Sequence, residues 1–274
     1  CHVKPPFRRC MAAQISTRKR CAAYFLPARE RWQLADTVFS VRFRRTEKSE
    51  FRVCFQFCGK DVCMGTFWDC SWENADAGRI AGYVERSERE AGTDAVIEYL
   101  RLVGARMVCD AGCGCGAYCL RLARNGFSVS GFDISARAVE IARRVLGRSC
   151  AEACLKVASL LETGYDDSLF DAVVSRDVVD HLPKREAVAA LEELCRIVRP
   201  GGIVFVTLDF SDDEYESEPH AVNGDGDYLF NAGKWDGMVF HPYSEDEIAE
   251  IVPDGVDVLL TRGADGFVLR LDVL

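Results

Sequence analysis

The sequence predicts an α/β fold: a seven-stranded, mostly parallel sheet with helices on both faces and a C-terminal antiparallel strand. Two observations predict it. From residue 64 onward, short apolar runs of strand length alternate with helical patterns, which is typical of a parallel sheet covered on both sides. The last two runs, 256–262 and 266–273, are joined through only a few residues. So short a link permits only an antiparallel hairpin.

The other elements follow in order from local signals. We expect helices near 94–101, 116–125, 136–147, 184–198 and 244–251, and strands near 106–110, 127–133, 154–158, 170–175 and 202–208. Ser135 directly precedes an apolar stripe of helical spacing, so it is the expected N-cap of its helix. Pro200 ends the next long helix, and the two glycines after it allow a turn into the following strand.

The most informative segment is the glycine-rich turn after the first strand. Residues 108–116 read Val-Cys-Asp-Ala-Gly-Cys-Gly-Cys-Gly, followed by a helical stretch. Glycines lack a Cβ and let the backbone pass close to a ligand. The start of the next helix adds N–H groups without intrahelical partners. This combination predicts a nucleotide-type site at the carboxyl edge of the sheet.

A second acid completes this expected site. Asp133 ends the second strand, 23 residues after Asp110. An acid in that place can accept hydrogen bonds from both ribose hydroxyls. Because Ser135 serves as the helix cap, Asp133 is expected to be available to a ligand.

In this order, the motifs resemble those of class I S-adenosylmethionine (SAM) methyltransferases over residues 68–274. The D-x-G-x-G-x-G spacing, Asp180-His-Leu182 and Arg199-Pro-Gly-Gly202 carry the resemblance. It implies the class I methyltransferase fold, SAM as cofactor and methyl transfer to an acceptor. Ser159 stands where the family often has an acid near the adenine, so one side-chain contact is in doubt. The residues implied for cofactor binding are Trp68, Tyr83, Asp110, Gly112, Cys113, Gly114, Gly116, Asp133, Ile134, Ser159, Leu160 and Arg176.

Methyl transfer needs an aligned nucleophile, and some acceptors need a general base. By position, His181 is the first candidate base, Asp177 a weaker one, and His241 a third. His181 follows the fourth strand at the edge of the expected crevice. It either takes a proton from the acceptor or packs the start of the next helix on the sheet.

Two segments are expected to build the acceptor pocket. Residues 67–72, rich in aromatics, together with Tyr83 form a candidate lid over SAM. Its rings either face the sulfonium or only pack. Residues 212–243 form an insertion that is acidic first and aromatic later, and we expect it to be a functional loop. Its aromatic half suggests a wall for a small acceptor, and its acidic half a solvated surface.

Composition excludes several classes of protein. The net charge of −9 argues against a nucleic-acid binder, which usually presents a basic face. There is no run of eighteen apolar residues, so no membrane span is expected. The 14 cysteines occur in a long chain of alternating strands and helices, unlike a small disulfide scaffold, and indicate reduced thiols in a cytoplasmic protein. The spacing of Cys109, Cys113, Cys115 and Cys119 does not fit a metal site, so we expect none.

Charge divides the chain at about residue 63. Residues 1–63 carry 14 Lys and Arg against 5 Asp and Glu, a formal +9, whereas residues 64–274 sum to −18. We therefore expect a basic N-terminal extension, 1–63, followed by the methyltransferase domain, 64–274. One interpretation is that Met64 is the natural start and that 1–63 is not native. The alternative is an ordered hairpin formed by the alternating residues 39–57.

Two other functions remain open from the sequence. A non-catalytic SAM- or nucleotide-binding regulator would keep the fold without the chemistry. A nicotinamide oxidoreductase is disfavoured by the glycine spacing and by the terminal hairpin. A small-molecule acceptor fits the acidic charge best.

Overall fold

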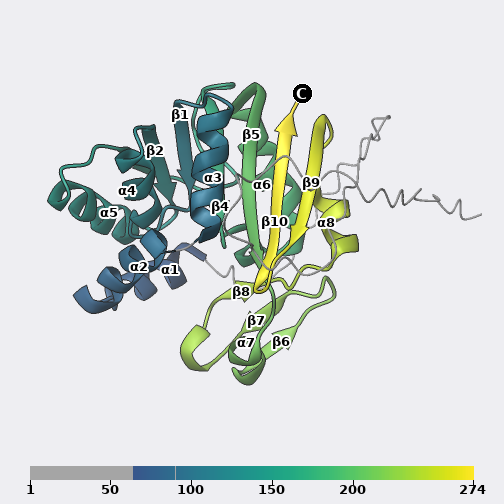
Figure 1. The fold of residues 1–274 in the computed structure, drawn as a ribbon. Helices are drawn as coiled ribbons and strands as arrows, with labels where there is room; N and C mark the ends of the chain where they lie inside the picture. Colours follow the sequence, from purple (N-terminus) through teal and green to yellow (C-terminus); the bar gives the residue numbers. More distant parts are fainter. Residues whose placement is uncertain (1–63, 90) are drawn as a thin grey trace, which may run out of the picture.

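The computed structural model describes residues 64–89 and 91–274, which are arranged around a seven-stranded sheet (Figure 1). The sheet order is β3-β2-β1-β4-β5-β10-β9. Strands β1 to β5 pair in parallel, and β10 runs antiparallel to both of its neighbours. The predicted architecture, with its reversed strand, is confirmed. The strands are β1 (Met107–Ala111), β2 (Ser128–Asp133), β3 (Cys154–Val157), β4 (Phe170–Arg176), β5 (Val198–Asp209), β9 (Val256–Arg262) and β10 (Gly266–Val273).

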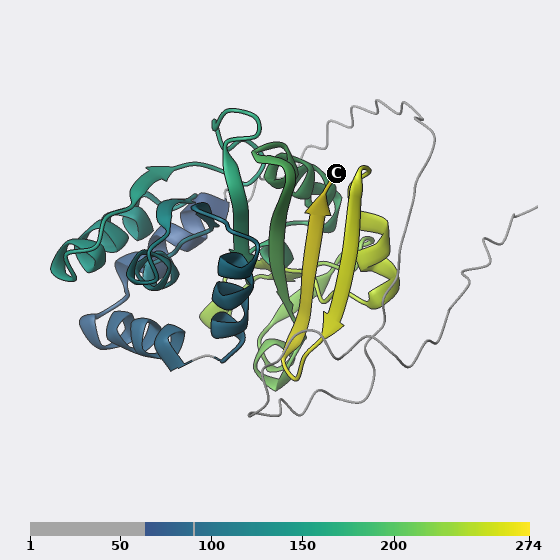
Figure 2. The same ribbon diagram turned by 45° about the horizontal axis from the view of Figure 1, so that its top comes forward.

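Helices cover both faces of this sheet, as Figures 1 and 2 show. One face is covered by α3 (Ala91–Leu102), α4 (Ala117–Arg124) and α5 (Ala136–Arg148). The other is covered by α6 (Lys184–Arg196) and α8 (Glu245–Ile251). Two helices that the sequence reading did not place, α1 (Met64–Glu73) and α2 (Ala77–Arg89), precede them, and α1 packs on α5.

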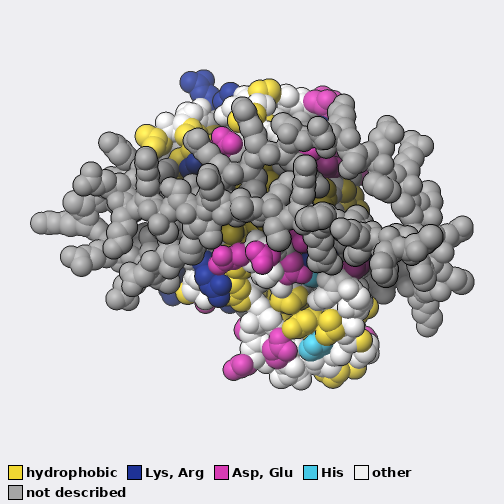
Figure 3. Space-filling model, turned by 90° about the vertical axis from the view of Figure 1, so that its right-hand side faces the viewer, with side chains coloured by type: hydrophobic (Ala, Val, Ile, Leu, Met, Phe, Trp, Pro, Cys, Tyr) yellow, Lys and Arg dark blue, Asp and Glu magenta, His cyan; other side chains and the backbone are white. Residues whose placement is uncertain are grey.

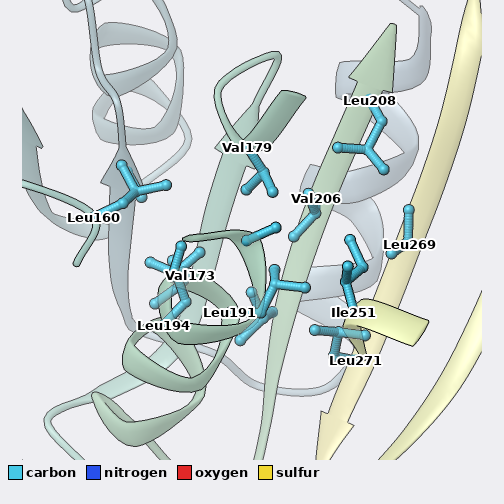
Figure 4. Packing of buried hydrophobic residues seen from close by; sticks show 14 of the residues in the cluster. Leu160, Val173, Val179, Leu191, Leu194, Val206, Leu208, Ile251, Leu269 and Leu271 are labelled. Carbon is cyan, nitrogen blue, oxygen red and sulfur yellow. The ribbon is translucent and has the colours of Figure 1, made fainter. Parts of the chain in front are cut away.

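The two core layers follow from alternation along the strands. In β1, Val108 packs with α3, α4 and α5, whereas its neighbour Cys109 packs on the α6 side. The larger layer joins strand residues to fully buried leucines of α6, among them Leu191 and Leu194 (Figure 4). Because side chains of a strand point alternately to its two faces, a strand covered on both sides is apolar throughout. This explains why these strands read as continuous apolar runs.

The fifth strand begins earlier than predicted. The preceding helix ends at Arg196, and β5 starts at Val198, before the Pro-Gly-Gly sequence. Its pairing with β4 shifts from Phe170↔Val198 to Ala172↔Ile203, so the glycines form an irregularity within the strand rather than a turn before it. A Cβ on Gly202 would lie 2.6 Å from the carbonyl oxygen of Asp171, which explains why glycine is required there.

The insertion is a folded unit, so the expectation of a loop over residues 212–243 is wrong. It contains α7 (Asp213–Ser217), the turn η2 (Gly233–Trp235) and an antiparallel sheet of β6 (His220–Val222), β7 (Tyr228–Phe230) and β8 (Val239–Phe240). Aromatic side chains give this unit a small core of its own, which also receives Phe67 and Trp68 from α1. Its acids are largely exposed, and Figure 3 shows acidic side chains on the lower lobe, where the insertion lies.

Some of the remaining predictions from the sequence concern the described residues, and others do not. None of the helices in the described ranges is long and apolar enough to cross a membrane. The eight cysteines within these ranges are all free thiols, half of them buried. The possible hairpin at 39–57 and the question of Met64 as a start concern residues 1–63, which lie outside the described residues.

Asp171 fastens three strands at the end of the sheet opposite the glycine turn. Its carboxylate accepts the backbone N–H groups of Arg106 (2.6 Å) and Met107 (2.9 Å) and binds Arg199 Nε. Although partial burial acts in the opposite direction, these hydrogen bonds and the charge of Arg199 lower the pKa of Asp171.

We expect Asp171→Ala to lower the free energy of unfolding by about 1.5–3 kcal/mol, because two backbone donors and an arginine lose a charged partner. The effect should be full above pH ~4, the ordinary pKa of aspartate, and should vanish as the pH falls through the lowered pKa. Urea unfolding at several pH values measures it. The control is Asp167→Ala, which breaks an exposed pair with Arg196 and should cost no more than about 1 kcal/mol.

Candidate active site

The glycine-rich turn lies at the carboxyl end of β1 and is fastened to β2. Gly112, Gly114 and Gly116 all have positive φ, 77°, 51° and 77°. The N–H groups of Gly112 and Cys113 both donate to the carbonyl of Phe132, at 2.9 and 2.8 Å. This left-handed backbone strongly favours glycine. The turn is therefore held at a fixed distance from the end of the second strand.

Side chains from elsewhere in the chain close on the same glycines. A Cβ on Gly112 would lie 2.4 Å from Cγ2 of Val178, which follows β4, and one on Gly116 would lie 2.8 Å from Cβ of Ala142. Gly114 lies against the indole of Trp72, to which a Cβ would come within 3.0 Å. Space at the turn is thus limited by α1, by α5 and by the segment after β4.

Asp133 lies beside the turn, as predicted, but it also organises the backbone. Its Oδ2 accepts the N–H of Gly114 at 2.8 Å, and its Oδ1 accepts the N–H of Ser135 at 2.9 Å. Ser135 caps α5 as expected, since its hydroxyl accepts the N–H of Ala138. Each oxygen of Asp133 keeps a further lone pair. Burial raises the pKa of Asp133, and the two backbone donors partly offset this rise.

Asp110 and the nearby thiols lie beneath the turn. Asp110 is buried, and its Oδ2 accepts a hydrogen bond from the thiol of Cys119 at 3.1 Å. Burial raises the pKa of Asp110 to about 6. Cys113 is also buried, and its carbonyl accepts the N–H of Gly116 at 2.8 Å, so its main chain holds the turn together. No cluster of His, Cys, Asp or Glu in the described part of the chain could hold a metal ion.

The expected lid is α1. Trp72 lies on the turn, and Asp69 accepts a hydrogen bond from the hydroxyl of Ser135 at the start of α5. Trp68 meets His181 edge to face, with ring centroids 5.0 Å apart. Tyr83, on α2, packs against Trp72 at 5.7 Å. The helix therefore spans the glycine turn and the segment after β4.

The expected adenine side lies after β2 and β3. Ile134 presents a partly exposed apolar side chain directly after Asp133. The hydroxyl of Ser159 accepts the N–H of Leu161 at 3.1 Å. The side chain of Leu160 belongs to the core, so only its backbone is available to a ligand. Arg176, at the end of β4, lies over the ring of Tyr118 at 5.2 Å and lowers the pKa of Asp110 through its charge.

His181 is buried between aromatic rings. It packs against Trp68 and Phe240, and its Nδ1 lies 3.2 Å from the carbonyl of Val239. A carbonyl can only accept, so Nδ1 carries the proton of the neutral ring and Nε2 is its basic nitrogen. Burial lowers the pKa of His181. The ring is therefore neutral at pH 7.

His241 has a different partner. Its Nδ1 lies 2.9 Å from Oδ1 of the buried Asp227, and that carboxylate also accepts the N–H of Lys184 at the start of α6. The hydrogen bond between Asp227 and Lys184 joins the insertion to the main domain. His241 holds the carboxylate that makes this bond, which is a structural role. Its backbone N–H donates to the carbonyl of Asp180 at 2.7 Å.

Two further acids, Asp180 and Asp209, lie with the predicted Asp177 at the ends of β4 and β5, and sequence reasoning did not assign them to the site. Asp177 is exposed, Asp209 is half-buried and Asp180 is completely buried. Asp177 has a positive φ of 54° and exchanges hydrogen bonds with Thr207. Asp180 Oδ2 accepts the N–H of Asp209 at 2.8 Å. The sequence contained a signal for this group, because acids at the carboxyl ends of neighbouring parallel strands lie at the same edge of the sheet.

Comparison with known proteins supports this geometry. Residues 108–202, from β1 into β5, match the family model described as a methyltransferase domain. Over these residues the chain is similar to methyltransferase domains, and the resemblance predicted from the sequence is confirmed.

Among curated relatives, a ubiquinone biosynthesis O-methyltransferase of Alkalilimnicola ehrlichii is 31% identical over 44% of this chain and 49% of its own length. A phosphoethanolamine N-methyltransferase of Triticum aestivum is 30% identical over 46% of this chain and 25% of its own length. The chain spans about half the length of the first curated relatives it matches.

Solved structures share the fold. A protein of Pyrococcus horikoshii has a TM-score of 0.58 at 15% identity, over 73% of this chain and 93% of its own. The magnesium protoporphyrin IX methyltransferase of Synechocystis, solved with bound SAH, has a TM-score of 0.52 at 18% identity, over 76% and 94%. The fold is that of class I methyltransferases.

We expect Gly112→Val to abolish SAM binding, because the new side chain would collide with Val178 and displace the turn. Gly126→Val is the matched control. Gly126 has a similar φ of 86° but nothing within 4 Å of a Cβ, so it carries the backbone strain without the collision. Calorimetric titration with SAM compares the two. Tight binding by the Gly112 variant would place the cofactor elsewhere.

Asp133→Asn should weaken SAM binding by about 1.5–3 kcal/mol, because the charged acceptor for the ribose is lost while one carbonyl oxygen remains for a backbone donor. Isothermal titration gives the dissociation constant, and the melting temperature reports whether the turn has stayed folded. A folded variant with unchanged affinity would restrict Asp133 to holding Gly114 and Ser135.

Proposed function

We propose that this protein transfers a methyl group from SAM to a small-molecule acceptor. The observation that carries the proposal is the match of residues 108–202 to a methyltransferase domain, since it spans Asp110, the glycine turn, Asp133 and His181. The geometry supports it, because the turn and Asp133 lie side by side at the carboxyl ends of β1 and β2. When bound, SAM would supply an activated methyl group.

The chain's own residues would bind and orient the reactants. We expect the turn and Asp133 to hold the cofactor, and the insertion, which packs on Phe67 and Trp68 of α1, to close the site on the side of the acceptor. Holding two reactants in line contributes up to about 7–11 kcal/mol to lowering the barrier. The net charge of −9 does not favour a nucleic acid as the acceptor. The free thiols of the described residues fit a cytoplasmic location, which we include in this proposal. The relatives include O- and N-methyltransferases, so their names leave the acceptor atom open.

The direct test is the formation of S-adenosylhomocysteine (SAH). The purified chain is incubated with methyl-labelled SAM and pools of small metabolites, and labelled products and SAH are measured. SAM binding without SAH formation from any pool would favour a non-catalytic regulator. Binding of NADH in place of SAM would favour an oxidoreductase and would overturn the proposal.

His181 is proposed as the general base. Its neutral ring, with Nδ1 held by a backbone carbonyl, presents Nε2 as an acceptor. The expected effect of His181→Ala is a loss of turnover of roughly a hundredfold, with SAM affinity nearly unchanged. The rate of the wild type should fall toward acid pH, with a midpoint below ~6.5, because burial lowers the pKa and protonation removes the base.

The matched control is His220→Ala, which removes a histidine stacked on Tyr228 within the insertion. It should leave the pH profile unchanged. If His181→Ala lowers only the melting temperature and keeps its turnover per folded molecule, His181 packs Trp68 and Phe240 and takes no proton.

A further inference from the structure

The acids that follow β4 and β5 form a row from the surface to the interior. Asp177 is exposed, Asp209 is half-buried, and Asp180 is completely buried. Asp177 lies close to Asp209, since its charge raises the pKa of Asp209, second only to burial. The row begins one residue before Val178, whose side chain lies against Gly112 of the glycine turn. It therefore starts beside the expected cofactor site.

No positive charge within the described ranges compensates these acids. None of the three forms an ion pair with a lysine or arginine there; their hydrogen-bond partners are Thr207 and backbone N–H groups. Asp180 Oδ1 is buried and has no hydrogen-bond partner in these ranges, and neither has the buried hydroxyl of Tyr243. A buried carboxylate oxygen without a partner carries a free-energy cost. The structure thus offers a place for a donor or a cation.

Aromatic rings border the same place. Tyr215 stacks on Phe240 with ring centroids 4.2 Å apart, and Phe240 also contacts His181. The acids raise the pKa of the Tyr215 phenol, second to burial, so its hydroxyl lies within their electric field. Carboxylates bordered by aromatic faces are a typical setting for an organic cation. A metal ion fits less well, since no three potential ligands converge in the described part of the chain.

We propose that the methyl acceptor is a protonated amine, held by Asp177, Asp180 and Asp209 at the carboxyl ends of β4 and β5. This inference rests on the proposed function. The ammonium group gives its proton to Nε2 of His181, the proposed base, and the freed lone pair forms the bond to the methyl carbon. The methyl–sulfur bond of SAM breaks, sulfur leaves as a neutral thioether, and the product is an ammonium ion with one more methyl group.

An amine fits the charges better than a phenol does. A phenol must become a phenolate-like nucleophile, and a phenolate beside three acids would be repelled. An ammonium ion is attracted by the same acids and leaves a neutral nucleophile after it gives up its proton. Burial raises the pKa of Asp180 to about 7, and burial with the neighbouring Asp177 raises that of Asp209. Such carboxyl groups ionise near neutral pH, so an ammonium ion that binds beside them favours their charged form.

These raised pKa values predict a pH dependence. Below them the acids are protonated and attract a cation weakly, so binding should strengthen as the pH rises through 7 and should release protons. Of the other titratable groups, Asp265 raises the pKa of Asp209. The acids of the row in turn raise the pKa values of Tyr215 and Tyr243, after burial, and Asp212 adds to the effect on Tyr215. His181 also feels the charge of Asp177.

The test uses the full chain saturated with SAH and two probes of the same shape. Choline carries a permanent positive charge and cannot be methylated, whereas 3,3-dimethyl-1-butanol is its neutral counterpart. We expect calorimetry to show choline binding at least about tenfold more tightly, as one favourable charge interaction implies. Choline affinity should rise between pH 6 and 8.5 with proton release. The neutral probe should show no such change.

Variants assign the effect to the row. Asp209→Asn and Asp180→Asn should each weaken choline binding by about tenfold or more, and the asparagine at 180 can still accept the N–H of Asp209. Glu192→Gln, an exposed acid on α6, should change nothing. SAH affinity should stay the same in all three variants, which shows that they are folded.

The outcomes separate the two proposals. Failure to bind SAH or SAM overturns the proposed function itself. Binding of SAH with equal or absent affinity for the two probes overturns the amine acceptor alone. So does Mg²⁺ or Mn²⁺ binding that is lost in Asp180→Asn, since the row would then hold a metal ion. Methyl transfer from labelled SAM to phenols but to no primary, secondary or tertiary amine overturns it as well.

Discussion

The left-handed turn after β1 is the constraint on which the candidate site depends. It exists only because three alternate residues lack a Cβ. Two of its N–H groups donate hydrogen bonds to the carbonyl of Phe132, near the end of β2. This attachment sets the distance between the turn and Asp133. The same glycines receive Trp72 from α1, Val178 from the segment after β4 and Ala142 from α5. One backbone conformation thus brings four separate parts of the chain to one edge of the sheet.

The edge is divided into two electrically different halves. At the ends of β1 and β2, the carboxylate of Asp133 is balanced by backbone donors. At the ends of β4 and β5, acids accumulate without compensating charges in the described ranges, and one buried oxygen has no partner. Because burial raises the pKa values of Asp180 and Asp209, a charged ligand that binds beside them would change their protonation. The proposed cofactor site and the proposed amine site therefore lie at the same edge of the sheet.

The sequence alone predicted the features that local chemistry encodes. Apolar runs of strand length, alternating with helical patterns, predicted the strands, and the short link at Gly263 predicted the reversed strand. Ser135 was identified as a cap because a cap needs only its own helix. The fold of residues 212–243 was not predictable in this way, since its short strands are held by contacts with α1 and with each other. Asp180 and Asp209 were missed because their burial and mutual contact exist only after β4 and β5 have paired. The proposed roles of His181, Asp177 and Asp133 stay predictions.

The position of β10 has a consequence for how the domain comes together. This strand is the last in the order of the chain, yet it lies between β5 and β9, with Leu269 and Leu271 completely buried. During synthesis, the sheet therefore lacks an interior strand until residues 266–273 have emerged. Until then β5 presents an unpaired apolar edge, a surface on which other chains can add strands. The sheet is thus completed late, by pairing between β10 and β5, which are far apart in the sequence.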